Sequence, residues 1–290
     1  KRQQYHLRLD QNGNLLGSNS YGGGGAEYTR VLKIDDNGDI VSTGYTNYIG
    51  NNDFNLLKTD AMGQLIFSKA YGNWAHDFSH HIEIGHGGGY LLSGYRRNYT
   101  SAPDYNGWLV RVDDNGIIQW NRRIKGPDNE SLTGTKTTSD GNYIITGWTD
   151  SYGQGGQDIL LIKVDDNGNI LWQKAFGGSG DERGAYVMET GDGGFLIGAH
   201  TTSFGQGAED ICLVKTDANG NFVWGKAYGS TGSDTYTAFG TLHELVDGYA
   251  FVANTESFGA GSQDFLLIKT NKNGDVECNY QSVAPFVEVN

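Results

Sequence analysis

Short apolar segments separated by turn residues recur along the whole chain. The clearest is 158–164, DILLIKV, which is followed by the turn DDNG and by a second apolar segment at 169–176, NILWQKAF. Runs of this length and composition, bounded by Gly and Asp/Asn clusters, predict β-strands. D-x-N-G is strong turn chemistry, because Asn and Gly tolerate a positive φ angle. We therefore predict a β-hairpin over 158–178.

This hairpin is repeated at a nearly constant interval. The turn glycines are 50 to 54 residues apart, at Gly13, Gly63, Gly116, Gly168, Gly220 and Gly274. Each module carries four strand signals, which in the fourth module fall at 185–190, 195–201, 210–216 and 221–228. Four antiparallel strands in each ~50-residue repeat predict a β-propeller.

We therefore predict an all-β fold in which 1–290 is a single propeller domain of four-stranded antiparallel blades. Five complete repeats cover approximately 26–72, 76–126, 129–178, 181–230 and 233–282. Residues 1–20 and 283–290 would form a closing or partial blade, with 284–290 supplying an inner strand. This gives about six blades, and five is the alternative.

Composition excludes some classes of partner and predicts the state of the cysteines. The 290 residues carry a formal net charge of −13, which disfavours nucleic acid, because nucleic-acid binding demands a basic surface. No apolar run approaches the ~20 residues of a membrane span, so we expect no membrane insertion. Cys212 and Cys278 occupy different strands of successive modules, which predicts two buried free thiols rather than a disulfide.

An acid stands six residues after each strand-four end. These acids are Glu27, Asp77, Glu130, Glu182 and Asp234, with Glu288 in the same register. Because they precede the innermost strands, we expect them around the mouth of the central channel, where a carboxylate ring would bind Ca²⁺ or another hard cation. Alternatively, each acid caps backbone N–H groups of its own crossing or pairs with a neighbouring Lys. Repetition in every module favours this structural role.

Two further sets of side chains are candidates for chemistry. Module two alone contains the cluster His76, Asp77, His80, His81 and His86, which would ligate Zn²⁺ or Cu²⁺ or act in acid–base steps; the alternative is solvated loop histidines. Lys58, Lys163, Lys215 and Lys269 each lie two residues before an acid or Asn. We interpret each Lys and its following acid as members of cross-blade pairs.

The repeat as a whole supports a resemblance. The pattern GGY-[LI]-[LI]-x-G-x-T-x-S-[FY]-G-x-G-x-x-D-x-x-L-x-K-x-D-x-x-G-x-x-x-W-x-K-x-[YF]-G-G is clearest at 143–178, 195–229 and 249–274. It resembles the propeller-type repeats of secreted and cell-surface proteins of bacteria and archaea. The resemblance implies a prokaryotic surface location and a role in adhesion or scaffolding.

Three functions follow as expectations. The first is a non-catalytic secreted or surface scaffold for adhesion, assembly or ligand binding, with other surface proteins, itself or glycans as partners. It would act through the face that carries the long loops 151–157, 203–209 and 257–263. The second is a quinoprotein-like or metal-dependent enzyme, since quinoprotein propellers have a similar D-x-x-G-x-x-x-W hairpin. The third is a glycan-binding lectin that uses Tyr152, Phe204 and Phe258, whose alternative role is inter-blade packing.

Overall fold

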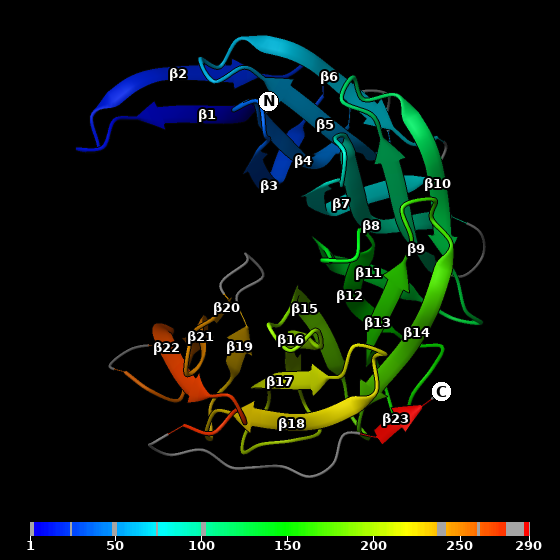
Figure 1. Cartoon of the computed structure of the whole chain (residues 1–290), viewed down its shortest axis with the longest axis vertical. Coiled ribbons are helices and arrows are strands. Elements are labelled where there is room, and N and C mark those ends of the chain that lie inside the picture. Colours follow the sequence, from blue (N-terminus) through cyan, green and yellow to red (C-terminus); the bar gives the residue numbers. More distant parts are fainter. Residues whose placement is uncertain are drawn as a thin grey trace. The chain divides into compact units, whose positions relative to one another are not determined.

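The computed structural model describes residues 3–23, 25–47, 51–73, 75–99, 103–236, 242–259, 262–276 and 287–289. Every regular element within these ranges is a β-strand, and none of their segments is a helix long and apolar enough to cross a membrane. The chain forms two compact units, 1–124 and 125–290, which are described in turn (Figure 1).

Unit 1 contains one strand pair and two four-stranded sheets. The pair consists of β1 (Gln4–Leu9) and β2 (Leu15–Tyr21). One sheet has the order β3 (Glu27–Ile34), β4 (Ile40–Thr46), β5 (Asp53–Thr59) and β6 (Leu65–Tyr71). The other has the order β7 (His76–Ile84), β8 (Tyr90–Tyr99), β9 (Pro103–Val112) and β10 (Ile118–Ile124).

Unit 2 contains three sheets. The first has β11 (Glu130–Thr137), β12 (Tyr143–Thr149), β13 (Asp158–Val164) and β14 (Ile170–Gly177), with β23 (Val287–Val289) added beside β14. The second has β15 (Glu182–Glu189), β16 (Phe195–Thr201), β17 (Asp210–Thr216) and β18 (Phe222–Tyr228). The third has β19 (Asp234–Tyr236), β20 (His243–Glu244), β21 (Gly248–Thr255) and β22 (Asp264–Asn271).

These sheets have the architecture of propeller blades. In four of the sheets consecutive strands pair antiparallel as a meander, and in the third sheet of unit 2 both β19 and β20 pair with β21, which pairs with β22. The set fits about five to six blades, as predicted. Strands two and three of module four lie at the predicted residues. The first strand begins three residues earlier than predicted, because Glu182 already pairs with Thr201 although its polar neighbours suggested a loop.

The predicted hairpin turn at 165–168 is confirmed. The Asp165 carboxylate accepts hydrogen bonds from the backbone N–H groups of Asn167 and Asn169. Gly168 has a φ angle of 78° and donates its N–H to the carbonyl of Asp165. The same contacts recur in the other D-x-N-G turns, so the repeated Asp serves its own turn.

Neighbouring sheets within a unit are joined by apolar cores and by aromatic residues that reach the next turn. In unit 2, one buried cluster lies between the sheets of β13 and β16 and includes Ile159, Phe176 and Ile197. Tyr71 donates its hydroxyl to the carbonyl of Gly116, and Tyr228 does the same to Gly274. The end of strand four in one blade is thereby bound to the outer turn of the next.

The predicted cross-blade Lys pairs are wrong. Lys163 forms an ion pair with Asp140, 2.7 Å away in the same sheet, and Lys215 pairs with Asp192 at 3.0 Å. The partner in each case is the acid of the turn between strands one and two, because the acid two residues after the Lys is already bound to its own turn. These pairs therefore fasten single blades.

The structure tests two further predictions, on the C-terminal strand and on the cysteines. Val287–Val289 pairs with β14, at the edge of that sheet, instead of supplying an inner strand. Cys212 is a buried free thiol, as predicted, and burial raises its pKa. Cys278 and the remainder of 277–286 lie outside the described residues.

Two turn glycines allow the energetic cost of backbone strain to be distinguished from the cost of a side-chain clash. Both Gly193 and Gly220 have φ near 79°, but a Cβ on Gly193 would meet nothing within 4 Å, whereas one on Gly220 would lie 2.7 Å from the Trp172 ring. We expect Gly193→Ala to lower the free energy of unfolding by about 1 kcal/mol. Gly220→Ala should lower the free energy of unfolding by about 2 kcal/mol more than Gly193→Ala, because the Trp172 ring must move.

Urea denaturation of both variants measures this difference. Gly17→Ala is the matched control, because a Cβ there meets nothing within 4 Å and its φ is not positive. Equal losses for Gly193→Ala and Gly220→Ala would contradict a packing role for Trp172.

Candidate functional site

The most distinctive surface of unit 1 is a row of five half-buried aromatic side chains. They come from β3, β4, β7, β8 and β9 and are named the aromatic belt: Tyr28, Tyr45, Phe78, Tyr95 and Tyr105. The belt lies at the end of each sheet where strand one begins and strand two ends. This is the end that carries the crossings and the long loops, where the sequence predicted binding.

Sheet register explains why these rings share one face. Tyr28 lies opposite Tyr45, and Phe78 lies opposite Tyr95 in the next sheet. Successive strand residues point to opposite faces, and the neighbours Asp77 and Ser79 are accordingly buried on the other side.

A β-bulge follows each of these positions on strand one. The register shifts between Thr29 and Val31, and again between Ser79 and His81. Gly44 and Gly94 lie opposite, where a Cβ would clash with the carbonyls of Tyr28 and Phe78. The bulge therefore requires glycine on the facing strand and bends strand one beside the belt.

The rings contact one another in sequence across both sheets. Tyr28 and Tyr45 are stacked with centroids 4.4 Å apart, and Tyr45 meets Phe78 edge-on at 4.8 Å. Phe78 is stacked on Tyr95 at 5.0 Å, and Tyr95 meets Tyr105 at 5.2 Å. These separations are typical of favourable aromatic pairs, so the belt is a preorganised surface.

Basic groups flank the belt in a chain that is acidic overall. The Arg97 guanidinium lies 5.1 Å from the centre of the Tyr105 ring, and the bulge residue His80 lies 5.3 Å from Tyr95. Burial raises the pKa of Tyr95 to about 12, so its hydroxyl stays protonated near neutral pH. The surface combines aromatic faces with hydrogen-bond donors.

The register positions that build the belt carry other side chains in unit 2. Ser131 lies opposite Trp148, Arg183 opposite His200, and Thr235 opposite Asn254. The position is thus repeated in every blade while its residue is not, in contrast to the acid directly before it.

Unit 2 has a polar depression of about 400 Å³ at the same end of its sheets. Its side chains include Asp128, Asn129, Asp150, Gln157, Asp181 and Arg183. Asn129 donates to Asp150 at 2.8 Å, and Arg183 donates to Gln157. Carboxylates, amides and a guanidinium are therefore held together at an open surface.

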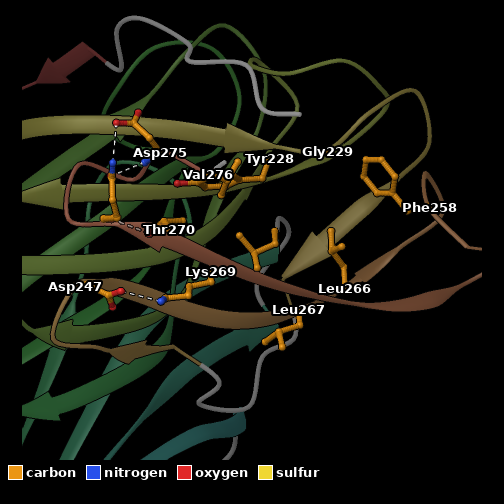
Figure 2. A pocket seen from close by; sticks show the side chains of 12 residues that line it. Tyr228, Gly229, Asp247, Phe258, Leu266, Leu267, Lys269, Thr270, Asp275 and Val276 are labelled. Carbon is orange, nitrogen blue, oxygen red and sulfur yellow. Dashed lines mark hydrogen bonds and ion pairs between the residues drawn. The ribbon is translucent and has the colours of Figure 1, made fainter. Parts of the chain in front are cut away.

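A second depression, of about 670 Å³, lies along β22 (Figure 2). Its walls include Leu266, Leu267, Phe258 and the Asp247–Lys269 ion pair, which measures 2.8 Å. Leu267 is 72% exposed. The predicted fourth strand of this blade continues past Val276 into residues outside the described ranges.

The predicted crossing acids are the first or second residues of strand one. They are buried, and four of them accept a hydrogen bond from the backbone N–H four residues upstream, at Gly23, Gly126, Gly178 and Ser230. Thr201 also donates to Glu182 at 2.6 Å. These contacts are those of the structural alternative, in which each acid caps its own crossing.

Asp77 shares this contact, since it accepts a backbone hydrogen bond from Asn73, and it binds an arginine in addition. Arg96 forms two parallel bonds to its carboxylate, at 2.9 and 3.0 Å. The described residues contain no group of three His, Cys, Asp or Glu side chains suited to a metal. The carboxylate ring of Glu27, Asp77, Glu130, Glu182 and Asp234 stays a prediction.

The structure brings each of three crossing acids close to a second buried acid, the residue that opens strand three of the preceding blade. The pairs, named the carboxyl pairs, are Asp53/Asp77, Asp158/Glu182 and Asp210/Asp234. Burial and the neighbouring Glu182 raise the pKa of Asp158 to about 7, and burial and Asp234 raise the pKa of Asp210 to about 6. Burial and Asp77 also raise the pKa of Asp53, whereas Arg96 lowers it.

Module-two histidines are spread over one strand and one turn. His76, His80 and His81 lie in β7, half-buried or buried, and His86 is exposed in the turn that follows. The interpretation as loop histidines is therefore wrong for three of them. His76 and His80 flank the aromatic belt, whereas His81 is buried; metal binding by the cluster stays a prediction.

The loop aromatics have divided roles. Phe204 packs against the buried cluster between its own blade and the preceding one, and a Cβ on Gly178 would lie 2.8 Å from its ring, as the packing alternative predicted. Tyr152 and Phe258 are 38% and 40% exposed.

Sequence reasoning missed the aromatic belt although a signal was present. The residue after each crossing acid is Tyr28, Phe78, Ser131, Arg183 or Thr235. A position that varies inside a regular repeat is free of the structural role, and this variation was the signal that singled out the belt.

No family model matches the chain, and no curated protein matches it. Solved structures show its fold. A protein of unknown function from Bacteroides caccae is similar over 96% of this chain and 93% of its own, with 10% identity and a TM-score of 0.51. The WD40 domain of Neurospora crassa Pan2 is similar over 89% and 67%, with 9% identity and a TM-score of 0.51.

A puromycin hydrolase is also similar, with 13% identity and a TM-score of 0.55. The match covers 98% of this chain and 43% of the hydrolase, so the chain spans less than half of that protein's length. At these identities the neighbours establish a β-propeller, a fold that carries both enzymes and WD40 domains.

The raised pKa values predict that stability falls as pH rises. A carboxyl group whose pKa is raised on folding binds its proton more tightly in the folded state, so the free energy of unfolding decreases between the unfolded value near 4 and the folded values of about 6 and 7. In EDTA we expect a loss of about 2 kcal/mol or more from pH 5 to pH 8.

Urea denaturation at each pH measures this loss. Asp158→Asn together with Asp210→Asn should flatten the profile, whereas Asp128→Asn, at an exposed acid, should leave its slope unchanged. A wild-type profile that rises over this range would contradict the prediction.

Proposed function

We propose that this chain is a non-catalytic, secreted or cell-surface prokaryotic β-propeller that binds carbohydrate through the loop end of its blades. The aromatic belt carries the proposal. Its five half-buried rings contact one another in sequence across two neighbouring sheets, beside Arg97 and His80.

Carbohydrate is the ligand class that suits this surface best. Sugar rings present C–H faces that pack on aromatic side chains, and their hydroxyl groups need both donors and acceptors. Phenol hydroxyls, a guanidinium and imidazoles provide these beside the apolar faces. The depression lined by Asp128, Asp150 and Asp181 in unit 2 offers further polar contacts of the same kind.

The surface location rests on the sequence. The repeat resembles those of secreted and cell-surface proteins, and the net charge of −13 suits an exposed, non-nucleic-acid-binding protein. A scaffold that presents a binding surface on repeated blades fits adhesion to polysaccharide or to glycosylated partners.

A glycan array followed by isothermal titration with the strongest array ligand tests the proposal. Tyr28→Ala and Phe78→Ala remove two rings from the row, and we expect each to weaken binding at least tenfold (about 1.4 kcal/mol). Tyr5→Ala is the matched control, because Tyr5 is 65% exposed in the same unit and outside the belt.

Thermal denaturation of each variant must accompany the titration, so that loss of binding is separated from loss of fold. Silence of the wild-type protein across the array would overturn the carbohydrate assignment. Equal weakening by Tyr5→Ala would overturn the assignment of the belt.

A further inference from the structure

We propose that the carboxyl pairs Asp158/Glu182 and Asp210/Asp234 each bind one hard divalent cation of the Ca²⁺ class between neighbouring blades of unit 2. This site differs from a ring of crossing acids, since each cation would be held by one crossing acid and by the acid that opens strand three of the preceding blade.

The first observation is an unsatisfied buried oxygen in each pair. Asp158 and Asp210 are each 1% exposed. Their Oδ1 atoms have no hydrogen-bond partner among the described residues. A buried carboxylate oxygen without a donor is costly, so such an atom indicates a missing positive partner.

The second observation is that these oxygens point at the other carboxylate. A Cβ on Gly177 would clash with Asp158 Oδ1 and would lie 2.6 Å from Glu182 Oε2. A Cβ on Gly229 would clash with Asp210 Oδ1 and would lie 2.7 Å from Asp234 Oδ2. Both carboxylates therefore converge on one point beside a glycine, and like charges so placed require compensation.

The nearby donors are neutral: Asp158 accepts one backbone hydrogen bond, from Gln154, and the others are engaged with the crossing acid. Glu182 accepts bonds from the Gly178 N–H, the Thr201 hydroxyl and the Ser203 N–H. The charged groups that act on Asp158 are Glu182 and Asp181, both negative. The described surroundings supply no cation to this pair.

In the third pair, Asp53/Asp77, an arginine compensates the negative charge. Arg96 occupies the register position of Thr201 and Thr255, opposite the crossing acid. Its guanidinium binds Asp77 through two bonds. Asp53 Oδ1 also has no hydrogen-bond partner among the described residues, but here the Arg96 charge acts on Asp53. One blade therefore carries its own cation, whereas the blades that begin with Glu182 and Asp234 have Thr at this position and no arginine.

Carboxylate oxygens are ligands that Ca²⁺ prefers, and water completes its shell of six to eight oxygens. Two carboxylates match the charge of one divalent ion. The competing arrangement is a single proton shared by each pair, and the experiment is designed to separate the two.

Equilibrium dialysis against Ca²⁺ at pH 8, on the full chain freed of metal with EDTA, is the direct test. We expect two tightly bound Ca²⁺ ions per chain, one in Asp158→Asn, one in Asp210→Asn and none in the double variant. Asp53→Asn is the matched control and should keep both ions, because Arg96 already serves that pair.

Thermal denaturation gives an independent readout. We expect 1 mM CaCl₂ at pH 8 to raise the melting temperature by about 5 °C in the wild type and in Asp53→Asn, and not in the double variant. If the double variant does not fold, the single variants still report one lost ion each. Absence of bound Ca²⁺ with an unchanged melting temperature would overturn the proposal in favour of a shared proton.

Discussion

The buried acid at the start of strand one is the interaction on which the blades depend. Its carboxylate accepts a backbone N–H from the crossing that precedes it and a hydroxyl from the strand beside it, as Glu182 does with Gly178 and Thr201. One side chain thus fixes both the path between two sheets and the register of the next. Because burying a carboxylate is costly unless it is fully bonded, the crossing can adopt few other conformations.

The same acid explains the remaining features of each blade junction. A glycine must precede the crossing, since any Cβ at Gly177 would meet the carboxylates. The acid that opens strand three then lies within the field of the crossing acid, which contributes to the raised pKa of Asp158. The stability of a junction, its buried charge and the position of its glycine therefore depend on one another, and each junction meets these constraints with slightly different residues.

The sequence predicted most of the fold because the same turn residues and apolar runs recur in each repeat. Turn chemistry located the 165–168 hairpin, and apolar runs located β16 and β17 at their observed residues. The start of β15 and the partners of Lys163 depended on which distant residues face each other. Periodicity along one chain does not contain that information.

The aromatic belt was harder to predict than the scaffold for the same reason. Repetition drew attention to Glu182 and Asp158, whose roles lie in the junctions. Tyr28 and Phe78 stand out only when register places them opposite Tyr45 and Tyr95 and contact links the two sheets. The charged residues that sequence reasoning selected hold the blades, and the aromatic residues it passed over face outward.

The strand-one bulge has an evolutionary consequence. It presents one pair of side chains per blade, such as Phe78 and Tyr95, on a face that the sheet's own hydrogen bonds do not constrain. Two substitutions in a blade would therefore change the chemistry of the surface without altering the frame that holds it. Duplication of a blade followed by drift at these two positions would generate new specificities, much as variable loops do on an immunoglobulin frame.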